Sequence, residues 1–408
     1  MSGLGPLGSL RSLRSLGSLR SRILALAAVI AAILGGGAWF ALSGASAQQH
    51  VASGKSGKGA ASAQAAKHAR QAAVKPITVV SVTPAAHTLN VNGADPIQIV
   101  FSSPLAADSP MPTVKPSVAG TWKRVGQDTL EFLPTQGFGE QTRVRVVIPG
   151  GSAGVRSAGG AVLAANVVDR FWTGSYSTMR AEQLLAQLGY LPLTWTSAAG
   201  TQAVPTTDAN AQLSAAYDPP AGSFTWQPGY PSELMDQWLP GQANEVLTGA
   251  VMAFESDHDL TMDGVAGPEV WHALLAAVAA GQDNSHGYTY ALASQASPET
   301  LTVWHDGKVI LDSPANTGIP AAPTTVGTAP VYLKFSFQIM RGTNPDGTKY
   351  ADPVSWVSYF RDGEAVHYFP RASYGFQQSL GCVELPYAQA KFIWPYLTYG
   401  TLVTVTAP

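Results

Sequence analysis

The only cysteine of this 408-residue chain, Cys382, follows His367 by fifteen residues. His367 ends an apolar run that is typical of a β-strand. In cysteine acyl transfer, an imidazole takes the thiol proton, the thiolate attacks a carbonyl, and the imidazole returns a proton to the leaving amine. A single cysteine excludes an intrachain disulfide and a CxxC metal site. The thiol is therefore either a buried bystander or a nucleophile with His367 as its base.

The residues just before the cysteine fit the nucleophile interpretation. The segment reads Ser379-Leu380-Gly381-Cys382-Val383. A glycine before the thiol lets a carbonyl approach closely, and the amides of Gly381 and Cys382 are candidates for an oxyanion hole. Ser379 either orients this loop, bonds near the imidazole or only occupies a turn, and the sequence leaves these alternatives open.

Residues 288–408 resemble the catalytic domain of the YkuD-type L,D-transpeptidases. The resemblance is carried, in order, by Asn316-Thr317-Gly318 with Pro323–Thr328, by HYFPRASYGFQQSLGCVEL, and by the closing strand GTLVTV. It implies that Cys382 attacks the third residue of a wall tetrapeptide stem and that the terminal D-Ala leaves. The side-chain amine of a second stem then resolves the thioester and forms a 3→3 cross-link. The resemblance also implies peptidoglycan stem peptides as partners and carbapenems as covalent inhibitors, and we expect no cofactor.

Three positions depart from the family pattern. Leu380 stands where the family usually has His, Lys or Arg, Glu384 where it often has Arg or Asn, and Tyr368 where it commonly has Gly. The first two changes remove polar groups beside the thiolate or the substrate carboxylate, which puts rate and substrate choice in question. The alternative is a non-catalytic peptidoglycan-binding wall protein with a degenerate transpeptidase domain.

Residues 340–360 contain two turn clusters and several aromatic residues, which suggests a lid over the cysteine. Tyr350 and Trp356 would then line the groove for the donor stem, although a core position is equally compatible with each. Arg371 and Tyr374, in the loop before the cysteine, are further candidates for substrate contact.

Two other cysteine-enzyme families fit less well. Sortases place an Arg shortly after the cysteine, and no Arg follows Cys382 in this chain. NlpC/P60 peptidases have their cysteine before the histidine, which is the reverse of the order here.

The rest of the chain predicts a multidomain, mainly β protein. Residues 77–174 alternate in short strands separated by Pro/Gly/Asp turns and resemble bacterial Ig-like β-sandwiches. Residues 177–283 have helical periodicity and resemble a small peptidoglycan-binding-like module, with Thr194–Pro228 as a polar insertion or loop. The catalytic domain at 288–408 is expected to be β-rich with one or two helices, including one near Tyr387–Tyr396.

The helical segment has acidic residues that could suggest a metal site. Asp257, Asp259 and Asp263 have no ligand at the fifth position of a calcium loop and no closing Glu, and His258 and His272 are not spaced as an HExxH pair. We assign no metal. Trp271 is expected in the core rather than as a sugar platform.

The N-terminal region predicts export. Residues 1–47 combine four arginines with an uncharged run from Ile23 to Leu42, which is typical of a single-pass membrane anchor or a cleaved signal peptide. Residues 48–76 form a basic, Ala/Ser/Gly-rich linker. Nine of the 24 basic residues lie before residue 76, which leaves 15 against 26 acidic residues in the remainder, a net charge of −11. This acidity argues against nucleic-acid binding, and we expect the protein on the wall side of the plasma membrane.

Overall fold

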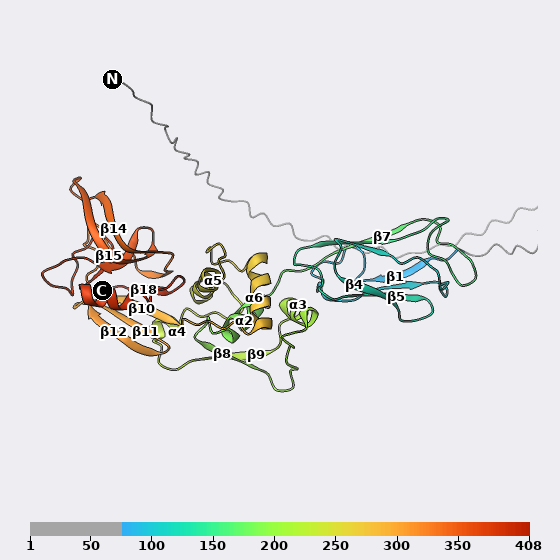
Figure 1. The fold of residues 1–408 in the computed structure, drawn as a ribbon, viewed down its shortest axis with the longest axis horizontal. Coiled ribbons are helices and arrows are strands. Elements are labelled where there is room, and N and C mark those ends of the chain that lie inside the picture. Colours follow the sequence, from blue (N-terminus) through green and yellow to red (C-terminus); the bar gives the residue numbers. More distant parts are fainter. Residues whose placement is uncertain (1–75) are drawn as a thin grey trace, which may run out of the picture. The chain divides into compact units, whose positions relative to one another are not determined.

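The computed structural model describes residues 76–408, in which strands predominate over helices (Figure 1). The predicted anchor or signal peptide lies outside these residues, as does all but the last residue of the predicted linker. Among the described helices, none is long and apolar enough to cross a membrane.

The Ig-like region is a sandwich of two antiparallel sheets. One sheet has the strand order β1-β2-β5-β4 and the other β3-β6-β7. The strands are β1 (Val79–Thr83), β2 (Ile97–Phe101), β3 (Thr113–Lys115), β4 (Gly120–Arg124), β5 (Thr129–Pro134), β6 (Arg143–Ile148) and β7 (Val167–Trp172). Apolar residues at alternate positions of β2, β5 and β6 point between the sheets and form one buried core, as the period-2 pattern predicts.

The helical region contains more regular structure than its sequence suggests. Its elements are α2 (Thr178–Gln187), β8 (Leu193–Ser197), α3 (Ala209–Tyr217), β9 (Gly222–Trp226), α4 (Ser232–Met235), α5 (Glu245–Asp257) and α6 (Pro268–Ala280). Of the two alternatives for Thr194–Pro228, an insertion or a loop, the loop was wrong, because the segment contains regular structure. Phe224 and Trp226 of β9 pack against the buried cluster of the helices, and this tertiary contact stabilises a hairpin whose local sequence is polar.

The core of the helices continues into the C-terminal region. Tyr290 and Leu402, both fully buried, belong to the same hydrophobic cluster as the helices. Gly249 of α5 and Gly400 explain the close approach, because a Cβ at either position would lie less than 3.0 Å from the other residue's carbonyl oxygen. The helical region therefore has no core of its own that is separate from the C-terminal region.

The C-terminal region packs a five-stranded sheet, β12-β11-β10-β18-β13, against a four-stranded sheet, β14-β15-β16-β17. The elements are β10 (Thr289–Ser294), β11 (Thr300–His305), β12 (Lys308–Pro314), β13 (Gly327–Pro330), β14 (Leu333–Thr343), β15 (Lys349–Arg361), β16 (Glu364–Tyr368), β17 (Val383–Leu385), α7 (Tyr387–Ile393) and β18 (Leu402–Thr406). The predicted hairpin turn at Asp306-Gly307 is present, and both residues have positive φ as a type I′ turn requires.

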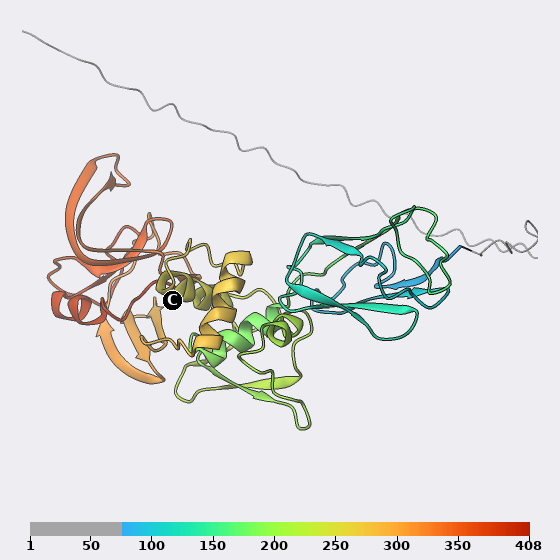
Figure 2. The ribbon, with the colours of Figure 1, turned by 45° about the vertical axis from the view of Figure 1, so that its right-hand side comes forward.

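The segment predicted as a lid is a long antiparallel hairpin. β14 and β15 pair from Leu333↔Tyr359 to Thr343↔Lys349, and the half of the hairpin nearer its tip continues beyond β16 (Figure 2). The tip, at residues 344–348, is fastened by Asp346, whose Oδ1 accepts from the backbone and the hydroxyl of Thr348.

Candidate active site

The pairing of β16 and β17 brings the predicted nucleophile and base to one face. The two strands run parallel, with Val366 opposite Val383 and His367 opposite Glu384. Because side chains alternate along a strand, His367, Glu384 and Cys382, which directly precedes Val383, share a face. The residues on the opposite face are buried between the sheets: Val366, Val383 and Leu385. Neighbouring strands thus join two residues that lie fifteen positions apart.

Cys382 is a partly buried residue that packs against the apolar side chains of Val354, Val357 and Ala365. The thiol donates to the carbonyl of Gly363 over 3.8 Å. Burial raises the pKa of the thiol to about 12, and the charges of Glu384 and Glu364 add to this increase. At neutral pH the cysteine is therefore a protonated thiol that needs a base.

The imidazole of His367 is 3% exposed. Its Nδ1 lies 2.9 Å from the carbonyl oxygen of Tyr368. Since a carbonyl only accepts, Nδ1 carries the hydrogen and Nε2 keeps a free lone pair. Burial lowers the pKa of His367, with the opposing influence of the Tyr368 carbonyl second, so the ring is neutral at pH 7. The described hydrogen bonds include none between His367 and Cys382, and each group is available to a ligand between them.

Ser379 holds the loop that presents the cysteine. Its hydroxyl donates to the Cys382 carbonyl at 2.6 Å and accepts from the Gly381 amide at 3.2 Å. The sequence left three alternatives open for Ser379, and these bonds agree with the one in which it orients the loop. Gly381 has φ +109°, a conformation that L side chains rarely adopt. Because its N–H already binds Ser379, the Gly381 amide does not point a free donor at a substrate, and this part of the predicted oxyanion hole is corrected.

Glu384, which departs from the family pattern, forms an ion pair with Arg371. Its carboxylate, 5% exposed, receives two bonds of 2.8 Å from Arg371, through Nε and Nη2. The Asn316 amide donates to the same carboxylate at 3.2 Å, and the Arg371 Nη2 also donates to the Gln378 carbonyl. The pair therefore fixes the loop before the cysteine and keeps a guanidinium beside it.

A hollow of about 470 Å³ opens over these residues and is lined by both Cys382 and His367. The β14–β15 hairpin contributes Tyr350, Asp352 and Arg341 to its lining, and Arg371 and Glu384 line it as well. Tyr350 and Arg371 thus line the same hollow as the cysteine, and their contact with a substrate stays a prediction.

Trp356 and Tyr374 do not line this hollow. Trp356 sits at an irregularity of β15 with φ +60°, on the side of the sheet that faces α7, where its ring packs against Tyr387 and Trp394. The extra residue at this irregularity turns the side chain toward the core face, which the sequence does not reveal. The Tyr374 hydroxyl donates to the Phe369 carbonyl at 2.6 Å and so holds the loop together. For Trp356 this matches the core alternative that the sequence left open, and substrate contact by Tyr374 stays a prediction.

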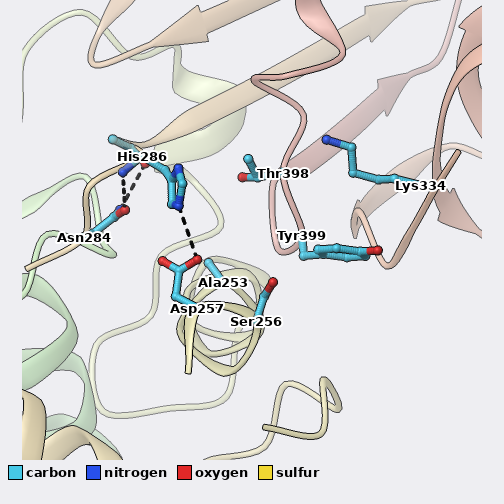
Figure 3. A pocket seen from close by; sticks show the side chains of 9 residues that line it. Ala253, Ser256, Asp257, Asn284, His286, Lys334, Thr398 and Tyr399 are labelled. Atoms are coloured by element: carbon cyan, nitrogen blue, oxygen red, sulfur yellow. Dashed lines mark hydrogen bonds and ion pairs between the residues drawn. The ribbon is translucent and has the colours of Figure 1, made fainter. Parts of the chain in front are cut away.

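A second, smaller hollow of about 250 Å³ lies beside α5 and contains His286, Asp257 and Lys334. Figure 3 shows His286 directed at Asp257, 3.5 Å away, and Lys334 on the other side of the hollow. Lys334 donates to the Trp394 carbonyl at 2.8 Å and lies over the Trp394 ring, and burial lowers its pKa to about 8. These contacts account for the lysine structurally. Within residues 76–408 no group of three or more His, Cys, Asp or Glu residues is arranged to hold a metal ion.

Comparison with known families agrees with the geometry around Cys382. Residues 288–405 match the model of the L,D-transpeptidase catalytic domain called YkuD, and residues 73–178 match a bacterial Ig-like domain. The chain contains a YkuD-type L,D-transpeptidase domain. No curated protein matches the chain.

The solved structures to which this chain is weakly similar include three L,D-transpeptidases. They are an L,D-transpeptidase from Mycobacterium smegmatis (16% identity, 82% of this chain and 100% of that one, TM-score 0.28), L,D-transpeptidase 3 from Mycobacterium tuberculosis (16%, 81% and 99%, 0.27) and the catalytic domain of an E. faecium L,D-transpeptidase (28%, 30% and 100%, 0.27). TM-scores this low establish no shared fold, so the assignment depends on the family matches.

Two residues of the transpeptidase domain were missed or misjudged from sequence. Glu364 lies beside the thiol, and its Oε1 accepts from the amide and the hydroxyl of Thr325. Glu384 was interpreted as a lost polar group, whereas it pairs with Arg371. The alternation of β17 places Glu384 on the face of Cys382, but no sequence feature pairs it with a loop arginine. Glu364 alternates with Val366 rather than with His367, so strand period gave no sign that it lies near the thiol.

Proposed function

We propose that this protein is a wall-side L,D-transpeptidase that forms 3→3 cross-links through a thioester on Cys382. The observation that carries the proposal is that Cys382, a neutral His367 and Arg371 surround one hollow within a matched L,D-transpeptidase domain. The N-terminal apolar run supports export to the wall side, where the stem peptides are found.

The proton steps follow from the states of the two groups. His367, neutral with its lone pair on Nε2, takes the thiol proton as Cys382 attacks the carbonyl of the third stem residue. The C–N bond to the terminal D-Ala breaks, and the imidazolium returns the proton to the leaving amine. A side-chain amine of a second stem then attacks the thioester, His367 accepts its proton, and the thiolate departs. The raised pKa of Cys382 means that thiolate forms during attack rather than before it.

Two further groups are proposed to act on the donor stem. The Cys382 amide remains as an oxyanion donor, since the Gly381 amide binds Ser379. Arg371, held in the hollow by Glu384, offers a cation for the carboxylate of the terminal D-Ala. Tyr350 lines the same hollow and is proposed to contact the stem. The peptidoglycan-binding role of the helical region remains a proposal based on its sequence.

The deciding experiment is the intact mass of the protein after incubation with a carbapenem, beside Cys382→Ala. Carbapenems mimic the acyl donor of the family that this domain resembles. We expect one adduct on the native protein, none on Cys382→Ala, and turnover of a tetrapeptide stem by the native protein alone.

The alternative is a wall-binding protein whose transpeptidase domain is inactive. Leu380, which departs from the family pattern, favours this alternative. Absence of both adduct and turnover in a folded, reduced protein, with stem binding unchanged in Cys382→Ala, would refute the enzyme proposal and support the binding protein.

A further inference from the structure

The outer face of the sheet β3-β6-β7 carries a row of cations. Lys115 of β3 lies opposite Arg145 of β6, and Arg145 lies opposite Arg170 of β7. Arg143, two residues before Arg145, adds a fourth cation on the same face. We call these four residues the basic face.

No residue of the basic face forms an ion pair within residues 76–408. None of the ion pairs in this part of the chain involves Lys115, Arg143, Arg145 or Arg170, and none of their side chains donates a hydrogen bond there. Arg143 only lies over the Trp172 ring, at 5.5 Å. Like charges directly opposite one another destabilise a sheet, so the row has a structural cost that the fold itself does not offset.

The other sheet of the same sandwich is arranged differently. There Lys123 of β4 lies opposite Glu131 of β5, so a cation faces an anion. The chain from residue 76 onward is also acidic, with a net charge of −11. The cations of this row are therefore not explained by a basic composition of the protein, and their clustering favours a site for an anionic ligand.

The shape of the basic face indicates what kind of anion fits. The four cations line a hollow of about 480 Å³, and Arg170 is half-buried in it while Lys115, Arg143 and Arg145 are exposed. The hollow is shallow and open, so an extended chain can lie along the row and contact all four cations. Three of the four cations are arginines, whose forked donors suit phosphate. Neighbouring strands lie about 4.8 Å apart, so one tetrahedral phosphodiester can bridge cations on two strands.

We propose that the basic face of the Ig-like domain binds a linear, phosphodiester-bearing polymer of the cell wall. Such a contact would hold the transpeptidase domain in the wall near its stems. The inference goes beyond the proposed catalysis and does not depend on acyl transfer by Cys382, although it assumes the wall-side location.

The test uses the full chain carrying Cys382→Ala, in detergent, with poly(glycerol phosphate) as the probe in a fluorescence titration. We expect saturable binding whose logarithmic affinity falls with the logarithm of salt, with a slope of about −0.7 per phosphate contacted. Arg145→Gln should weaken binding on the order of fivefold and make that slope less steep by about 0.7, the value for one phosphate contact. Lys123→Gln, on the opposite sheet, should leave binding unchanged.

Thermal unfolding separates a binding role from a structural one. Because Arg145 lies between two other cations, Arg145→Gln should not lower the melting temperature. Loss of binding together with a lowered melting temperature would indicate a structural role and overturn the proposal. The absence of binding, or equally tight binding of poly-glutamate, would also overturn the proposal. Tighter binding to anionic phospholipid vesicles than to the polymer, unchanged by Arg145→Gln, would overturn it as well.

Discussion

The ion pair between Arg371 and Glu384 gives the sharpest stability prediction. The Glu384 side chain is 5% exposed and the Arg371 side chain 28% exposed. Loss of Arg371 should therefore destabilise the fold more than loss of the Glu384 charge, because the carboxylate cannot reach water. In Arg371→Met, the buried carboxylate keeps only the Asn316 amide at 3.2 Å, and we expect a cost of about 3 kcal/mol. In Glu384→Gln, the guanidinium can turn toward water and still bind the Gln378 carbonyl, so about 1–2 kcal/mol is expected.

Cys382 itself provides the assay. It is the only thiol of the chain, and its raised pKa slows labelling in the folded state. A short pulse of a thiol reagent at increasing urea therefore reports unfolding around this site. With a denaturant slope of about 1.5 kcal/mol per molar urea, Arg371→Met should lower the midpoint by about 2 M.

Double substitution tests the reasoning behind these numbers. Arg371→Met with Glu384→Leu removes both charges and should cost about 2 kcal/mol less than the sum of the single changes. The exchange of Arg371→Glu with Glu384→Arg re-forms the pair with reversed polarity and should recover part of the loss. Additivity of the single changes to within about 0.5 kcal/mol would refute the view that the pair fixes this loop.

Four further results are expected. Gly381→Ala, whose added Cβ would meet no neighbouring atom closer than 3.7 Å, should lose about 1–3 kcal/mol from backbone strain at φ +109° and slow carbapenem acylation; an unchanged melting temperature would contradict this. Ser379→Ala removes two hydrogen bonds and should lower the urea midpoint by an amount equivalent to about 2 kcal/mol, whereas native stability would mean that the loop holds itself. Alkylation of Cys382 by iodoacetamide should still rise between pH 9 and 10, because burial raises the thiol pKa to about 12, and Glu364→Gln should shift the profile to lower pH; a plateau below pH 9 in the native protein would disprove it. Burial raises the pKa of Glu255 to about 7, so its contribution to stability is full below pH 4.5 and is lost as pH rises toward 7; Glu255→Gln should therefore be relatively stabilising at pH 8, by up to about 3 kcal/mol, and an equal effect at pH 4.5 and 8 would count against this.

The sequence by itself determined which chemistry was available. One cysteine, a histidine at a strand end and the Ser-x-Gly before the thiol are local features, and they indicated Cys382 and His367 without a structure. The alternating apolar residues of β2, β5 and β6 and the turn at Asp306-Gly307 were predictable for the same reason, because strand period and turn geometry depend on neighbouring residues.

Only the tertiary structure decided which side chains meet. The parallel pairing of β16 and β17 put His367, Glu384 and Cys382 on one face, and a loop arginine thirteen residues before Glu384 completed its ion pair. An irregularity in β15 turned Trp356 away from the site, and packing on the helices made a hairpin of β8 and β9. These outcomes depend on contacts between residues far apart in the chain, which local propensity and periodicity do not encode.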